Sequence, residues 1–145
     1  MIGVAVGGLL VGVCLVVYLV LRPSTSPAKV ADSSNATQAF CADMRTAAQG
    51  HTTLADALAL YDSLEADAPA DIRRDVAKMV AIGRVTSSAF ASLGSNAPAS
   101  DVQAVFASFT PEQQQFIRDL AALSKGYDVA PGIAKTVFTY AHSHC

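Results

Sequence analysis

The sequence predicts an all-α protein: an N-terminal transmembrane helix followed by an antiparallel bundle of about four to six helices. Three observations lead to this prediction. Residues 2–21 form an apolar run of twenty residues without a charge. Residues 36–145 repeat apolar positions at helical spacing, and Gly or Pro stands between the repeats. The period-two alternation that marks a half-buried strand is not sustained anywhere in the sequence.

Residues 1–22 are expected to be a retained membrane anchor. At about 1.5 Å per residue, twenty helical residues span roughly 30 Å, which matches the hydrocarbon core of a bilayer. A cleaved signal peptide is the alternative, but it would have a basic start and an apolar run of only about 7–15 residues. A lipoprotein signal around Cys14 is disfavoured, because the bulky Val13 precedes the cysteine and the apolar run continues beyond it.

Four glycines in this segment, Gly3, Gly7, Gly8 and Gly12, form two G-x-x-x-G patterns. Such spacing lets a second transmembrane helix approach closely. The expected partners are therefore the lipid bilayer and a membrane protein that packs against this helix.

Residues 23–35, rich in Pro, Ser, Thr and Ala, are expected to be a flexible linker, and residues 36–145 the bundle domain. A Ser, Thr or Pro stands where several helices are expected to start, and a Gly where several should end. Ser100 and Thr110 each precede a Gln by three residues, which is the pattern of a capping box. The expected helices are residues 36–49, 53–66, 69–93, 100–109, 110–125 and 131–145.

The charges of the chain exclude one class of function. It carries 12 acidic and 10 basic residues, a net charge of −2, and the two signs are interspersed. Without a basic patch to neutralise phosphates, nucleic acid is not an expected partner.

Two cysteines, Cys41 and Cys145, bracket the predicted domain, which favours a disulfide bond between them. The bond would bring the start of the first domain helix and the end of the chain to one pole. It would also require an oxidising, extracytoplasmic compartment. Arg22 and Lys29 argue for the opposite orientation, because basic residues after a membrane helix favour a cytoplasmic C-terminal side. Two unrelated thiols in a cytosolic domain are the alternative; we favour the disulfide.

Several short motifs occur in a familiar order: Phe40-Cys41, then residues 68–75 (APADIRRD), residues 137–140 (VFTY) and the final Cys145. In this order the chain resembles small exported or membrane-anchored helical proteins of actinobacteria, which are uncharacterised and lipoprotein-like, with an "FC…P-x-[DE]-I…C" pattern. The resemblance implies export, a Cys41–Cys145 bridge and no assigned activity. The chain departs from the lipoprotein members in lacking a good lipobox.

Candidate chemistry in the domain is sparse. His142, His144 and Cys145 form an H-x-H-C tail that could bind a metal, but residues two apart on a helix diverge, and a bridged Cys145 would not be a ligand. Asp71 and Asp75 are expected to share a helix face with Arg74 and Lys78 close by, the pattern of a solvated helix surface rather than an acid–base pair. No nucleophile elbow, zinc-protease, C-x-x-C or P-loop motif is present. We therefore expect no enzyme, no catalytic or metal residues and no cofactor.

The function expected from the sequence is that of a membrane-anchored extracytoplasmic helical module with a structural or interaction role, such as an accessory subunit of an envelope or membrane complex. The alternative is a small-ligand or metal-binding helical protein. In that case the aromatic residues of the predicted helices could line a pocket; they are Phe90, Phe106, Phe109 and Phe116.

Overall fold

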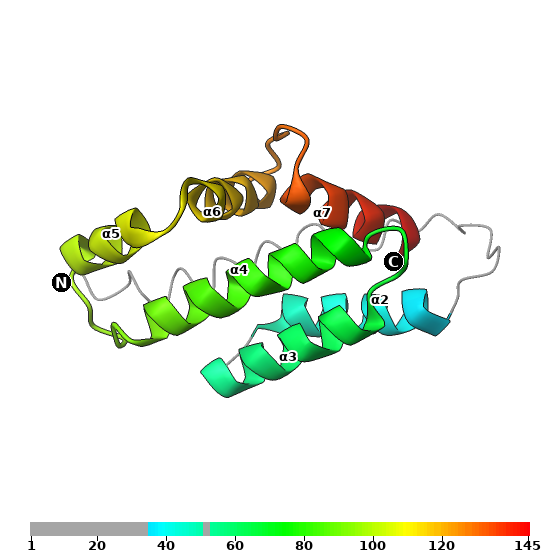
Figure 1. Cartoon of the computed structure of the whole chain (residues 1–145), viewed down its shortest axis with the longest axis horizontal. Coiled ribbons are helices and arrows are strands. Elements are labelled where there is room, and N and C mark those ends of the chain that lie inside the picture. The colour runs from blue at the N-terminus through cyan, green and yellow to red at the C-terminus, as the bar shows by residue number, and fades with distance from the viewer. Residues whose placement is uncertain (1–34, 51–52) are drawn as a thin grey trace.

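A computed structural model of the chain describes residues 35–50 and 53–145, which form six helices and no strand (Figure 1). The predicted all-α class and helical bundle are confirmed for this part of the chain. None of the described helices is both long and apolar enough to span a bilayer. The predicted anchor and nearly all of the predicted linker lie outside the described residues. The helices are α2 (Asn35–Gln49), α3 (Leu54–Asp67), α4 (Arg73–Ala91), α5 (Ala99–Ser108), α6 (Pro111–Ser124) and α7 (Ile133–His144).

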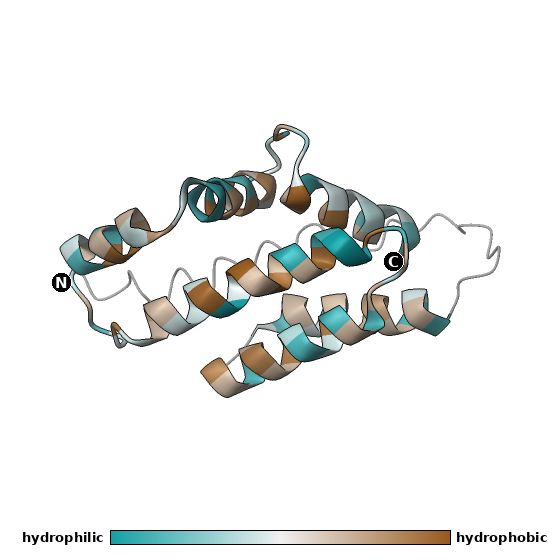
Figure 2. Ribbon diagram, viewed as in Figure 1, coloured by the Kyte–Doolittle hydropathy of each residue, from teal (hydrophilic) through white to brown (hydrophobic). Residues whose placement is uncertain are grey.

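Helix α4 runs through the middle of the bundle. In Figure 1, α2 and α3 lie side by side below α4, while α5, α6 and α7 follow one another above it. Consecutive helices α2, α3 and α4 run in alternating directions, as expected for helices joined by short connections. Hydrophobic and hydrophilic residues alternate along the helices in Figure 2, because each helix turns one apolar face toward its neighbours.

The main core joins α2, α3, α4 and α7. Phe40, Val76, Val80 and Val137 are fully buried in it, and each comes from the apolar stripe of its helix. A smaller cluster forms where α6 and α7 meet α4, around Ile82, Phe116 and Ala134. Burial of these side chains supplies most of the drive for folding, since each large apolar side chain removed from water contributes about 1.5–3 kcal/mol.

Most helix ends follow local signals in the sequence. The Thr53 hydroxyl accepts a hydrogen bond from the Asp56 amide and caps α3. Thr110 and Gln113 form the predicted capping box of α6, with Pro111 as its first residue. Gly50 and Gly126 follow α2 and α6 with φ angles of 88° and 76°, a conformation that glycine adopts without strain.

Three predicted helix starts were wrong. The helix expected at Pro69 begins at Arg73, because the Ile72 amide first closes a tight turn on the Pro69 carbonyl. The capping box expected at Ser100 is absent: α5 starts at Ala99 after Pro98, and the Ser100 hydroxyl turns to Asp101. The last helix starts two residues after Pro131, at Ile133. Of the three starts, the one at Pro69 is displaced by a turn that takes the place of the predicted first helical turn.

At Gly83 the backbone of α4 lies against the Tyr61 ring of α3. A Cβ atom on Gly83 would lie 2.7 Å from Cζ of the Tyr61 ring, so the phenol occupies the space a side chain would need. The Tyr61 hydroxyl and the Ser87 hydroxyl are 3.0 Å apart and form a hydrogen bond one helical turn further on. Two small residues on α4 thus create the groove that receives Tyr61.

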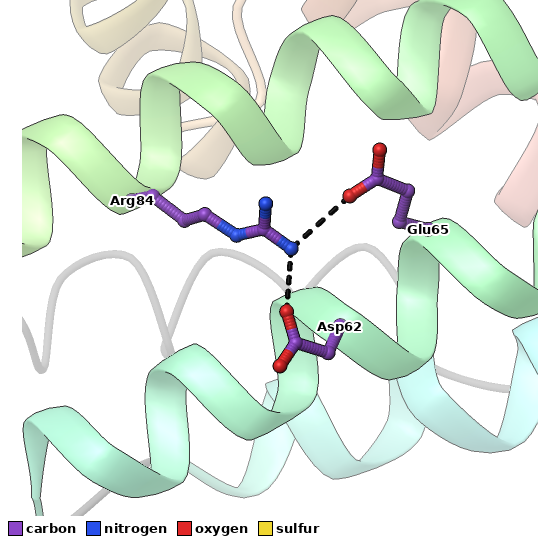
Figure 3. A network of polar contacts seen from close by, with 3 residues as sticks. All are labelled: Asp62, Glu65 and Arg84. Atoms are coloured by element: carbon purple, nitrogen blue, oxygen red, sulfur yellow. Dashed lines mark hydrogen bonds and ion pairs between the residues drawn. The ribbon is translucent and has the colours of Figure 1, made fainter.

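On the surface, Arg84 of α4 connects to α3. Its guanidinium forms ion pairs with Asp62 and, at 3.1 Å, with Glu65 (Figure 3). All three side chains are substantially exposed. Each ion pair therefore contributes little to the free energy of unfolding, about 0–1 kcal/mol. The apolar contacts and the Tyr61 groove determine how α3 and α4 pack.

The Tyr61 groove leads to a first prediction. Gly83→Ala should lower the free energy of unfolding by about 1–3 kcal/mol, because the new methyl group overpacks the α3–α4 contact. In a Tyr61→Ala background the same substitution should be neutral or stabilising, since alanine favours a helix over glycine by about 0.5–1 kcal/mol. Denaturant unfolding followed by circular dichroism measures both. Equal destabilisation in the two backgrounds would contradict the steric explanation.

Candidate functional site

The most distinctive chemistry of the described residues lies where the start of α2 meets the end of α7. We call this region the disulfide pole. The start of α4, whose first turn is strongly hydrophilic, lies at the same end of the bundle (Figure 2). The disulfide pole consists of Thr37, Phe40, Cys41, Tyr140, His144 and Cys145.

Cys41 and Cys145 are joined by a disulfide bond across a sequence separation of 104 residues. Their Cα atoms lie 5.3 Å apart, within the usual range for bridged cysteines. Cys41 is buried, with 4% of its surface exposed, because it follows Phe40 on the inner face of α2. The predicted pairing is thus confirmed, together with the prediction that the first domain helix and the chain end meet at one pole.

Tyr140 holds the two helices together beside the disulfide. Its ring meets Phe40 edge to face, with ring centroids 6.0 Å apart, and its hydroxyl lies 3.2 Å from the Thr37 hydroxyl. On its other side the ring stacks on the His144 imidazole at 4.0 Å. One aromatic side chain therefore contacts both the interior of α2 and the last turn of its own helix.

The arrangement does not support the metal site considered for the H-x-H-C tail. The Cys145 sulfur is bonded to Cys41 and has no thiolate to offer. The His144 ring is stacked on Tyr140, and its Nδ1 lies 3.0 Å from the Tyr140 carbonyl oxygen. Among the residues that the structure describes, no group of three or more His, Cys, Asp or Glu side chains is arranged to hold a metal ion.

A second polar region lies between α2 and α3. It is a shallow, open depression of about 440 Å³, lined among others by Asp43, Thr46, Asp56 and Ser63. The Ser63 hydroxyl donates a 2.8 Å hydrogen bond to Asp43. Partial burial raises the pKa of the Asp43 carboxyl, and the nearby Asp67 carboxylate acts in the same direction, while the Ser63 hydrogen bond opposes them.

The aromatic residues considered as a ligand pocket divide into two groups. Phe109 meets Phe90 and Phe106 edge to face, at centroid distances of 5.6 Å and 6.5 Å. Phe116 instead packs in the cluster with Ile82 and Ala134. The rings of the first group contact one another and fill the space between them.

Asp71 and Asp75 do not share a helix face, because Asp71 lies in the turn before α4. The glycines expected to pack in the membrane, Gly3, Gly7, Gly8 and Gly12, lie outside the described residues.

Sequence reasoning did not identify Tyr140 as the residue that connects the disulfide pole, or Asp43 with Ser63 as a polar pair. In the sequence, Tyr140 stood out only as the end of the motif of residues 137–140. Its partners, Thr37 and Phe40, are about a hundred residues away, so no local pattern relates them.

Comparison with models of protein families, with characterised proteins and with solved structures gives no match for this chain.

The disulfide pole yields a stability prediction. Reducing the bond, or replacing both cysteines by alanine, should lower the free energy of unfolding by up to about 4–5 kcal/mol in the chain-entropy model for a loop of about a hundred residues. Helix content at room temperature should stay unchanged, because the apolar core remains. Thermal unfolding with and without reductant measures the loss. The double alanine variant is the control, and its thermal unfolding should not change when reductant is added. If reductant destabilised this variant as much as the natural sequence, the result would contradict the prediction.

Proposed function

We propose that this chain is a single-pass membrane protein whose C-terminal helical module, residues 36–145, lies on the extracytoplasmic side of the cell membrane. The observation that carries the proposal is the disulfide bond between Cys41 and Cys145. Such bonds persist in oxidising compartments and are rare in the cytosol. The uncharged run of residues 2–21 supports the anchor, and the motif resemblance to exported actinobacterial proteins is compatible with this placement.

The role we propose is structural, or one of interaction: an accessory subunit that recruits or stabilises a larger membrane or envelope complex. Two features support binding over catalysis. The side chains at the disulfide pole are occupied with one another, as Tyr140 illustrates by contacting Phe40, Thr37 and His144. The glycine spacing in residues 3–12 suits contact with a partner helix within the bilayer.

The orientation is tested by thiol labelling. Of the three cysteines, only Cys14 should react with a maleimide after denaturation of the unreduced protein purified from cells. Cys41 and Cys145 should react only after reduction, because both sulfurs are bonded. Peptide mapping by mass spectrometry assigns the label. Reaction of both Cys41 and Cys145 without reductant would remove the argument for export, and the basic residues after the anchor would then favour a cytoplasmic domain.

The partner is tested by co-purification from mild detergent at native abundance, with the bound proteins identified by mass spectrometry. A specific membrane protein should accompany the full-length chain. Replacing Gly7 and Gly8 by leucine should reduce its recovery, because the larger side chains prevent close helix approach. Leucine at Val11 is the matched control and should leave recovery unchanged. A lone monomer would contradict the proposal, and a stoichiometric small molecule or metal in native mass spectrometry would favour the ligand-binding alternative.

A further inference from the structure

Helix α5 (Ala99–Ser108) differs from the other described helices in how it is held. It buries none of its side chains completely. Its apolar positions, Val102, Val105 and Phe106, are only half-buried although they share one face. Among the other helices, α4 is its main neighbour, over a short stretch. The side chains of α5 itself would therefore lose little burial if α5 left the bundle while the rest stayed folded.

Two aromatic rings lie next to α5. Phe90 of α4 and Phe109, the residue after α5, are each 7% exposed and meet edge to face. The Phe106 ring of α5 meets Phe109 edge to face, with ring centroids 6.5 Å apart. Phe106 thus links α5 to this pair through Phe109.

The C-terminal end of α5 is connected to α6 by two polar side chains. Gln114 donates a hydrogen bond to the Phe109 carbonyl at 3.1 Å and reaches the Ala107 carbonyl at 3.5 Å. Arg118 donates to the Gln114 side-chain oxygen at 3.1 Å, and its guanidinium lies over the Phe106 ring, 5.4 Å from the centroid. The cation thus holds Phe106 from the solvent side.

The N-terminal end of α5 lacks comparable connections among the described contacts. Its cap residue, Pro98, provides no side-chain hydrogen bond to the first turn. Residues 92–98, which join it to α4, include Gly94 with a φ angle of 73°. On the other side, Thr110 is fixed by the capping box of α6. The two ends of α5 are therefore held unequally, with a firm attachment point at Phe109 and Thr110.

We propose that α5 is a flap that opens about Phe109 and Thr110 while the rest of the bundle stays folded, and that Gln114 and Arg118 form the latch that keeps it closed. Opening withdraws Phe106 and uncovers the Phe90–Phe109 ring pair. Segments with few buried apolar contacts open at a lower free energy than the global unfolding of the protein. Opening thus exposes an aromatic surface at the end of the bundle opposite the disulfide pole (Figure 1). It requires neither the membrane anchor nor a particular orientation of the domain.

Amide hydrogen exchange of the oxidised full-length chain, read by mass spectrometry of peptides, tests the flap. Peptides covering residues 99–108 should exchange through a local opening, faster and with a weaker dependence on denaturant than the slowest amides of residues 73–91 and 133–144. Arg118→Ala and Gln114→Ala should each speed exchange of residues 99–108 by about three- to tenfold. Arg118→Ala removes the cation–π contact with Phe106, and Gln114→Ala removes the hydrogen bonds to the Ala107 and Phe109 carbonyls. Exchange in α4 and α7 should not change.

Arg84→Ala is the matched control, since it removes an exposed arginine that pairs with α3 and is not part of the latch. It should leave residues 99–108 unaffected. The proposal is overturned if residues 99–108 exchange only together with α4. It is equally overturned if neither latch variant changes their exchange, or if these variants speed exchange uniformly across the bundle. Both latch residues lie on the surface of α6, so circular dichroism should report a folded bundle for each variant.

Discussion

The covalent bond between Cys41 and Cys145 is the constraint that joins the two ends of the helical domain. It closes a ring that contains all of α3 to α7, and so brings the beginning and the end of the bundle to one pole. A domain of about 110 residues has a modest apolar core, and a long closed loop reduces the entropy of its unfolded chain. The same bond requires an oxidising environment, which connects the stability of the fold to the compartment proposed for it.

Packing is unevenly distributed away from that pole. The helices nearest the disulfide share one continuous core, in which Val76, Val80 and Val137 are fully buried. Toward the other end, α6 packs through a smaller cluster and α5 through half-buried side chains. Because local opening costs less where fewer apolar contacts are broken, this gradient predicts a rigid half beside the disulfide and a more readily opened half beyond it. Such a gradient is compatible with the interaction role proposed above.

Local signals were sufficient for much of the secondary structure. Apolar residues at helical spacing identified all six described helices, and side-chain capping at Thr53 and Thr110 set two of their starts. The signals failed at the starts of three helices. At Pro69 a tight turn precedes the helix, and at Ser100 the helix begins one residue earlier without the capping box. A proline or serine is compatible with both outcomes, so the surrounding fold determines which one forms.

The sequence by itself determined the all-α class of the described residues and the approximate positions of the six helices, and it favoured the pairing of the two domain cysteines, since these follow from periodicity, capping chemistry and cysteine position. The tertiary structure alone decided which helix faces meet. The Tyr61 ring fits the space beside Gly83, Tyr140 joins Phe40 across about a hundred residues, and Arg118 covers Phe106. Such contacts depend on the rotation and offset of packed helices. These are set by the shapes of many side chains at once, and no local pattern records them.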